Sequence, residues 1–388
     1  MNRYLGAFLF ILAVYLITPL ATIVFNYSID PFERYHAGVR AEDMARLLKS
    51  ADLLLQVPSN YEDRLLMKKF LQVREKPAFA VLGGSRIMNI HEGLLRGEYR
   101  SGFLNAGVSA GTVSDYVSIW KAMKRERKIP GILYLEIDAQ AIYSNFNGNF
   151  SWSTFAPDYF AFKLEKGGKK SLKRAWKSVR RLFFFHLQRL TSWEWTAKSL
   201  EKKNLNRTPF VLIQNMARNP DVPARTPGFA LLYPRASSPL SHEFLEEWGK
   251  KNGDYEVRYL ADWGSMSDHA FSELSDLISD IAKHGVRLVV VIPPSHPFSY
   301  RTVASSSIAF PNMLRFIEAV RVMSEEAGAS FFDGLHENRH LVDGMDFVDG
   351  VHVNPETNAR VMAAAGKAAG LDLFVSENPD RRNPAARL

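Results

Sequence analysis

The sequence predicts an α/β fold in which a parallel sheet carries helices on both faces, with a membrane-spanning helix before it and a large insertion within it. Three observations support this prediction. Short apolar stretches alternate with helix-like stretches from residue 77 onward, residues 4–29 carry no charge, and residues 151–264 interrupt the alternation. The 388 residues are 46% hydrophobic, which is enough for a large core, and the absence of cysteine excludes disulfides and cysteine nucleophiles.

Residues 4–29 are long enough to cross a hydrocarbon core, which takes about 20 helical residues. A cleaved signal peptide has an apolar core of only about 7–15 residues, whereas this run continues to Tyr27. The pattern therefore predicts an uncleaved anchor over residues 1–29 that contacts the lipid bilayer. Arg3 before the run and Asp30 after it favour a cytoplasmic N-terminus, with the rest of the chain outside. A buried core helix is the less favoured alternative, because such helices are seldom this long without a charge.

The alternating segments after residue 77 define the expected sheet. The expected strands are Phe79–Leu82, Phe103–Ala106, Ile132–Ile137, Arg287–Ile292 and Ser330–Asp333. The expected helices are Thr112–Arg127, Ser267–His284, Met313–Ala327 and Pro355–Ala369. Strands and helices in this order are typical of a parallel sheet, whose ligands bind at the carboxyl ends of the strands.

Changes in composition divide the chain further. A charged, helix-prone connector spans residues 30–76. The α/β domain comprises residues 77–150 and 265–375, the insertion comprises residues 151–264, and the polar residues 376–388 form a flexible tail.

The formal net charge of +8 arises from the insertion, where residues 163–189 contain ten Lys or Arg and one acidic residue, Glu165. We expect a lid helix that packs Trp176 and Phe183 inward and exposes a cationic face to solvent. Attraction to anionic lipid headgroups or to an acidic polysaccharide is the alternative. Four other tryptophans of the insertion fit either core packing or stacking on sugar rings: Trp152, Trp193, Trp195 and Trp263.

The stretch AVLGGSRIMN, residues 80–89, places Ser85 directly after the first expected strand. Gly-Gly-Ser is also common turn chemistry, and Ser is a good N-cap, so this stretch alone leaves open whether Ser85 is a nucleophile. Gly107 follows the second expected strand and Asp138 the third. All three residues are expected at the carboxyl edge of the sheet.

The stretch DFVDGVHVN, residues 346–354, places Asp349 three residues before His352, just ahead of an expected helix. An Asp that accepts a hydrogen bond from one imidazole nitrogen leaves the other nitrogen free to take a proton from a serine hydroxyl. This is the orienting pattern of a Ser-His-Asp site. A surface loop with a solvated histidine fits the same residues.

The serine after the first strand, the run FLNAGVSAGT at residues 103–112 and the Asp-x-x-His before the last helix together resemble the SGNH/GDSL hydrolase family. The resemblance covers residues 77–138 and 287–369. It implies a flavodoxin-like three-layer sandwich of the SGNH hydrolase type.

The same resemblance implies a role for each matched residue. Ser85 corresponds to the nucleophile, His352 to the base and Asp349 to the orienting group. The backbone N–H groups of Ser85 and Gly107 correspond to the oxyanion hole.

The match departs from the family pattern in two places. Gly-Gly-Ser stands where the family has Gly-Asp-Ser, and the third block, LYLEIDAQAIYSN at residues 133–145, lacks the Gly-x-Asn-Asp pattern whose Asn normally donates to the oxyanion. Asn105, Arg86 and Asn145 are the alternatives for that substrate or oxyanion contact.

Gly-Ser-Arg after the first strand, the N-terminal anchor and Pro-Ser-His at residues 294–296 resemble the membrane-anchored branch of this family. That branch is similar to proteins of alginate O-acetylation and to the D-alanyl transfer protein of teichoic acid synthesis. The resemblance implies an esterase or O-acyltransferase that acts on acyl groups, acetyl in particular, of a cell-surface polysaccharide. It also implies a single-pass protein of the bacterial inner membrane with its catalytic domain on the periplasmic or extracellular side, beside a membrane-bound O-acyltransferase. His296 either packs in its loop or contacts the substrate.

Other classes of function are weighed against this one. Histidines and aspartates cluster over residues 336–352, but HENRH lacks the HExxH spacing of a zinc protease, so we expect neither a metal nor another cofactor. Nucleic acid is not an expected partner of an exported domain. A catalytically inactive polysaccharide-binding or scaffolding subunit, and a structural partner docked through the anchor and connector, remain as alternatives to an enzyme.

Overall fold

The structure is a computed structural model that describes residues 17–29, 39–50, 54–56, 63–143, 150–204, 211–213, 224–232, 241–262, 264, 266 and 268–375. Several sequence predictions fall outside these residues and stay predictions: those on residues 4–16 of the anchor, Asn145, Trp263, the tail at residues 376–388, and the side chains of Trp152 and Trp176.

Five apolar stretches form one parallel sheet, as the alternation of strands and helices predicts. In sheet order these strands are β3 (Phe103–Gly107), β2 (Phe79–Gly83), β4 (Ile132–Glu136), β8 (Arg287–Ile292) and β9 (Ser330–Asp333). Numbered along the chain within this sheet, the order is 2-1-3-4-5, which is compatible with a flavodoxin-like sandwich. The strand order changes direction between β2 and β4, where sheets of this kind leave a crevice for ligands.

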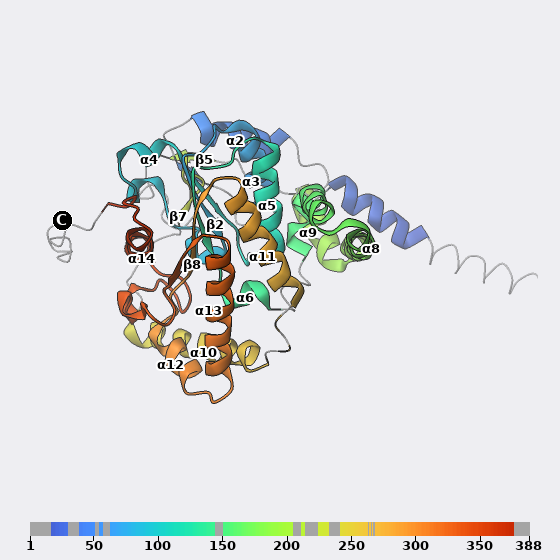
Figure 1. The fold of residues 1–388 in the computed structure, drawn as a ribbon. Helices are drawn as coiled ribbons and strands as arrows, with labels where there is room; N and C mark the ends of the chain where they lie inside the picture. Colours follow the sequence, from blue (N-terminus) through green and yellow to red (C-terminus); the bar gives the residue numbers. More distant parts are fainter. Residues whose placement is uncertain are drawn as a thin grey trace, which may run out of the picture.

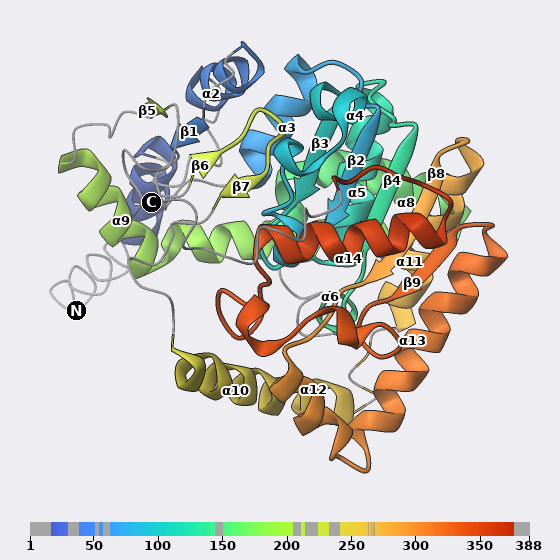
Figure 2. The same cartoon turned by 90° about the vertical axis from the view of Figure 1, so that its left-hand side faces the viewer.

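Helices cover both faces of the sheet (Figures 1 and 2). Along β2, Ala80 and Leu82 pack into one hydrophobic cluster while Phe79 and Val81 pack into another, as side-chain alternation in a strand requires. The first face carries α3 (Asp63–Val73), α5 (Val113–Arg125), α11 (Asp268–Lys283) and α13 (Ala309–Glu326), and the second carries α14 (Pro355–Ala368). The expected helices of the α/β domain are therefore confirmed to within a few residues at each end.

Residues described between 39 and 73 pack onto this core, although the sequence suggests a connector there. Met44 of α2 (Val39–Ser50) and Phe70 of α3 are buried in the first cluster. Arg64 of α3 donates to the Asp115 carboxylate at 2.7 Å, and this carboxylate also caps the first turn of α5. Burial of an amphipathic face and of a paired charge fixes this segment against the sheet domain.

A second, antiparallel sheet joins the segment before the α/β domain to the insertion. Its order is β5 (Val211–Ile213), β1 (Leu54–Gln56), β6 (Ala224–Arg225) and β7 (Leu231–Leu232). Strand β1 therefore pairs with strands that follow it by more than 150 residues.

The insertion contributes helices to two separate places. The long α8 (Ala156–Thr191) begins after η3 (Phe150–Phe155), packs against α5 and leads into α9 (Trp193–Asn204). Trp195 of α9 is buried, while Trp193 is 77% exposed and Phe183 is 63% exposed, so Phe183 does not pack inward as the sequence suggests. The last helix of the insertion, α10 (His242–Ala261), packs on α12 (Pro297–Ala304) at the carboxyl end of the sheet.

Short elements complete the described chain. They are η1 (Ser85–Ile87), η2 (Glu92–Leu94), α4 (Gly97–Ser101), α6 (Ala139–Ile142), η6 (Arg339–Leu341) and η7 (Gly344–Asp346).

Residues 17–29 form a helix whose Asn26 side chain contacts α8 and α9. The Asn26 amide is buried, donates to the Leu190 carbonyl at 2.7 Å and accepts from the Ser199 hydroxyl at 2.9 Å. Within the described part of the chain, no helix combines the length and the apolar character needed to cross a membrane.

Substitution of one buried and one exposed tryptophan tests the described packing. Trp120 of α5 is fully buried and donates from Nε1 to the Asp280 carboxylate of α11 at 2.8 Å. We expect Trp120→Ala to lower the free energy of unfolding by about 3–5 kcal/mol, because it leaves a large cavity. Trp193→Ala at the exposed position should change this energy by less than about 0.5 kcal/mol. Urea unfolding measures both, and equal losses would contradict the described packing.

Candidate active site

The turn after β2 places Ser85 at the carboxyl edge of the sheet. Gly83 and Gly107 end the two adjacent strands β2 and β3 there, and neither position has room for a side chain. A Cβ on Gly83 would lie 2.4 Å from Oε2 of Glu136 on β4, so no larger residue fits there without displacing that carboxyl. A Cβ on Gly107 would lie 2.9 Å from Oδ1 of Asn105. Ser85 then begins the single turn η1, so its side chain stands at the strand order switch.

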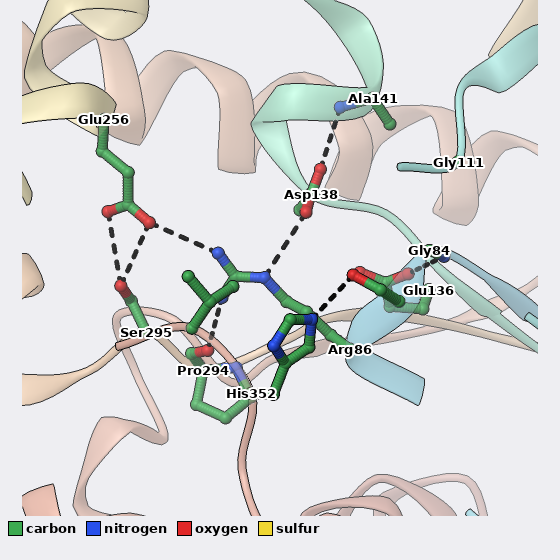
Figure 3. Close-up of polar contacts among 12 residues, drawn as sticks. Gly84, Arg86, Gly111, Glu136, Asp138, Ala141, Glu256, Pro294, Ser295 and His352 are labelled. Atoms are coloured by element: carbon green, nitrogen blue, oxygen red, sulfur yellow. Dashed lines mark hydrogen bonds and ion pairs between the residues drawn. The ribbon is translucent and has the colours of Figure 1, made fainter. Parts of the chain in front are cut away.

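The structure brings the three residues of the predicted catalytic group together. Nε2 of His352 lies 2.8 Å from Oγ of Ser85, and Nδ1 of His352 lies 2.7 Å from Oδ2 of Asp349 (Figure 3 shows His352 at the sheet edge). With Nδ1–H donating to the carboxylate, the Nε2 lone pair faces the serine hydroxyl. When a hydroxyl, an imidazole and a carboxylate are hydrogen-bonded in this order, the imidazole can activate the hydroxyl as a nucleophile.

The loop that holds Asp349 orients its carboxylate by backbone hydrogen bonds. Oδ1 of Asp349 accepts from the N–H groups of Val351 and His352, both at 2.7 Å. Burial alone would raise the pKa of the Asp349 carboxyl, but the His352 ring and these N–H groups lower it below its ordinary value. Asp349 is therefore ionised, as the acceptor of the imidazole proton has to be.

Three asparagines attach the serine turn to its surroundings. Asn89 donates to the Val353 carbonyl at 2.7 Å, and Asn358 of α14 donates to the Arg86 carbonyl at 2.6 Å. These two hydrogen bonds connect the turn after Ser85 to the chain segment that carries His352. They therefore fix the position of Ser85 relative to His352.

Asn105 is the third, and its position corrects the expectation that it contacts the substrate. It is fully buried on β3, and its amide donates to the carbonyls of Ile87 and Ile90 at 2.7 and 2.8 Å. Its Oδ1 accepts the Gly107 N–H at 2.9 Å. Asn105 therefore shapes the turn after Ser85, and the Gly107 N–H expected in the oxyanion hole is held by Asn105 in this state. The oxyanion roles of Ser85 and Gly107 stay predictions.

Arg86 points into a buried ionic cluster, shown in Figure 3. Its guanidinium donates to the Pro294 carbonyl at 2.9 Å, and pairs with Glu256 of α10 at 3.3 Å and with Asp138 at 3.5 Å. Burial opposes the charge, but Asp138 and Glu256 raise the pKa of Arg86, so it stays protonated. A buried cation needs such partners, which the sequence does not locate. Arg86 thus joins the serine turn to α10.

His296 is packed in its loop, and its expected contact with the substrate stays a prediction. It is 1% exposed, caps α12 by accepting the Phe298 N–H at 3.2 Å, and meets the Phe347 ring edge-on at 4.9 Å between centroids. Burial lowers its pKa below the ordinary value, which favours the neutral ring. Because Phe347 precedes the Asp349 loop, His296 supports that loop from inside.

Histidines and aspartates between residues 336 and 352 form hydrogen bonds and ion pairs within the protein. Asp346 pairs with Arg360 at 2.7 Å, and His336 shares a hydrogen bond of 2.7 Å with the Tyr300 hydroxyl. Over the residues that the structure describes, no three His, Asp or Glu side chains are grouped to hold a metal ion.

Glu136, Asp138 and Glu256 are site residues that the sequence analysis does not assign. Glu136 ends β4, where its Oε2 accepts the Gly84 N–H at 2.6 Å. Asp138 caps α6 by accepting the Ala141 N–H at 2.8 Å. One signal could have drawn attention to Glu136. An acidic residue ends an otherwise apolar strand that is buried on both faces, where a charge is costly.

Comparison with known proteins adds no family to this description. No protein-family model matches the chain, and no curated protein matches it either. The geometry of the site and the sequence resemblance therefore carry the functional argument.

Asn105 offers a test of how the serine turn is held. Asn105→Ala would remove the side-chain partner of the Ile90 carbonyl and of the Gly107 N–H, and one of the two donors to the Ile87 carbonyl, which keeps the Ile90 N–H. Because a single buried polar group left without a hydrogen bond costs about 1–3 kcal/mol, we expect the unfolding free energy to fall by at least that amount. Asn338→Ala, which removes one loop hydrogen bond to the Asp333 carbonyl, is the control and should cost only about 0.5–1.5 kcal/mol. Equal costs in denaturant titrations would argue against this role.

Proposed function

We propose that this protein is an SGNH-type serine esterase or O-acyltransferase that forms an acyl-enzyme on Ser85. The observation that carries the proposal is the chain of two hydrogen bonds from Ser85 Oγ through the His352 ring to Asp349, at 2.8 and 2.7 Å. Its position at the strand order switch of a flavodoxin-like sheet adds support, because ligands of such sheets bind there.

In the proposed reaction, Ser85 Oγ attacks the carbonyl carbon of an acyl ester. Nε2 of His352 takes the hydroxyl proton, while Asp349 stabilises the imidazolium that forms. The tetrahedral intermediate collapses, the carbon–oxygen bond to the leaving alcohol breaks, and His352 returns the proton to that alcohol. Water or a second hydroxyl then attacks the acyl-Ser85 ester by the reverse steps, which gives hydrolysis or transfer respectively.

The class of substrate follows from the resemblance to the membrane-anchored SGNH branch. The proposed substrates are acyl groups, acetyl in particular, on a cell-surface polysaccharide outside the inner membrane. A membrane-bound O-acyltransferase is the proposed partner. The insertion fits a specificity element in this scheme, because its helix α10 is joined to the serine turn through Glu256 and Arg86.

An inactive polysaccharide-binding or scaffolding subunit is the second candidate function. Two observations favour it: the Gly107 N–H is engaged by Asn105, and the third block lacks the Gly-x-Asn-Asp pattern that normally supplies an oxyanion donor. Transition-state stabilisation by such donors is commonly the largest part of catalysis of this kind.

An acetyl ester assay separates the two candidates. We expect the purified protein to hydrolyse p-nitrophenyl acetate, and Ser85→Ala and His352→Ala to reduce this activity by at least about 10³-fold, because each removes a member of the hydrogen-bonded chain. Asp349→Asn should cost a comparable factor, because it removes the acceptor of the Nδ1 proton.

Thr357→Val is a matched control, since this hydroxyl pairs with Asp346 rather than with Ser85. It should leave the rate within a few-fold of wild type. A wild-type protein as inert as Ser85→Ala, or variants as active as wild type, would favour the scaffolding function.

Membrane association is a separate part of the proposal. Ile17, Leu20, Val24 and Tyr27 recur at helical spacing and are 45–61% exposed on the helix over residues 17–29. Exposed Phe183 and Phe184 lie on α8, the helix that this segment joins through Asn26 and Leu190. An apolar surface of this extent suits contact with lipid.

We expect deletion of residues 1–29 to move the protein from the membrane fraction to the soluble fraction, because the uncharged run is then removed. Fractionation at low and high salt measures this. Tight membrane binding of the truncated protein at high salt would contradict a single anchor, whereas binding lost only at high salt would indicate the basic segment at residues 163–189.

A further inference from the structure

Glu136 is a buried carboxyl group that the proposed reaction does not yet use. It ends β4 and is 1% exposed. Its Oε2 accepts the Gly84 N–H at 2.6 Å, and Gly84 directly precedes Ser85. Its Oε1 is equally buried and has no hydrogen-bond partner among the described residues. Figure 3 shows this carboxyl beside Gly84, at the same end of the sheet as His352.

The charged and titratable groups around Glu136 do not neutralise an ionised carboxylate. Arg86 is the nearby cation, but its guanidinium is hydrogen-bonded to Pro294 and paired with Glu256 and Asp138. Asp138, two residues along the chain, adds a negative charge. Tyr116 of α5 is another titratable neighbour, and its own pKa is raised by burial and by Glu136.

These surroundings favour the neutral form of Glu136. Burial raises the pKa of this carboxyl to about 8, with a further contribution from Asp138, while the Gly84 N–H and Arg86 oppose the change. A protonated carboxyl still accepts the Gly84 N–H through its carbonyl oxygen. The group therefore holds the peptide next to Ser85 without adding charge at neutral pH.

We propose that Glu136 is a positioning residue for the acyl transfer and that it serves the reaction in its protonated form. The inference rests on the proposed function. The tetrahedral intermediate carries a negative charge next to the Ser85 N–H, within the same turn that Glu136 holds. An ionised Glu136 would add a second negative charge near this turn. The two negative charges would repel strongly, because the low dielectric of the protein interior screens them little. The protonated carboxyl fixes the turn and avoids this repulsion.

The pH dependence of activity is the direct test. Above its pKa, the protonated fraction of an acid falls about tenfold per pH unit. We expect the Ser85-dependent hydrolysis of p-nitrophenyl acetate by wild type to fall about tenfold between pH 7 and pH 9. Glu136→Gln keeps an oxygen acceptor for the Gly84 N–H but has no acid to ionise. This variant should therefore retain activity within a few-fold at pH 7 and lose the alkaline decrease, mainly in kcat rather than KM.

A measurement of stability tests the protonation of Glu136 without reference to activity. The unfolded carboxyl ionises near its ordinary pKa of 4.5, whereas the folded carboxyl ionises near 8. Between these values only the unfolded state releases the proton, so wild type loses stability as pH rises. The stability of Glu136→Gln relative to wild type should accordingly increase from pH 4.5 to pH 8 and stay constant above.

Glu273→Gln is the matched control, because Glu273 is another buried carboxyl but pairs with Lys163 at 3.0 Å. It should leave the alkaline decrease unchanged. Active protein whose alkaline decrease persists in Glu136→Gln would overturn the role of Glu136 and leave the proposed function standing. A stability difference that rises as expected, in a protein with no Ser85-dependent activity, would overturn the proposed function and the positioning role of Glu136 with it.

Discussion

The close approach of β2 and β4 at Gly83 is the constraint on which the candidate site depends. With no side chain at this position, the Glu136 carboxyl fits against β2 and accepts the Gly84 N–H. This bond fixes the direction in which the chain leaves the strand, and Ser85 follows as the next residue. A site assembled on strand ends in this way gains precision from the sheet itself, because the strand register is set along the whole ladder.

Buried polar side chains connect the serine turn to the surrounding elements. Asn105 holds the turn from β3, Asn358 from α14, and Arg86 connects it to α10. Each of these groups would be costly to bury alone, and each is paired with groups from another element of the fold. The site therefore couples the sheet, the last helix and the insertion into one hydrogen-bonded unit.

The sequence predicts the sheet, and it singles out the three side chains Ser85, Asp349 and His352 that the structure brings together, because both predictions depend on local patterns. Apolar runs of strand length set the five strands, and the spacing of Asp349 and His352 sets their shared loop. The contacts of Arg86 and Asn105 could not be predicted in the same way, because the direction of a side chain depends on partners in other elements, such as Glu256 and Ile90. The packing of helices α2 and α3 onto the core is equally a matter of tertiary contacts, since an amphipathic helix does not reveal what covers it.

The antiparallel sheet between β1 and the insertion has a consequence for how the chain assembles. Leu54 on β1 pairs with Ile213, so this strand emerges from the ribosome long before its partners are synthesised. Closing so long a loop costs little more entropy than closing a moderate one, but it cannot begin until the later residues exist. During translation β1 is thus an unpaired edge, open to mispairing or to a chaperone. The N-terminal part of the protein reaches its native structure only after more than half of the chain has been made.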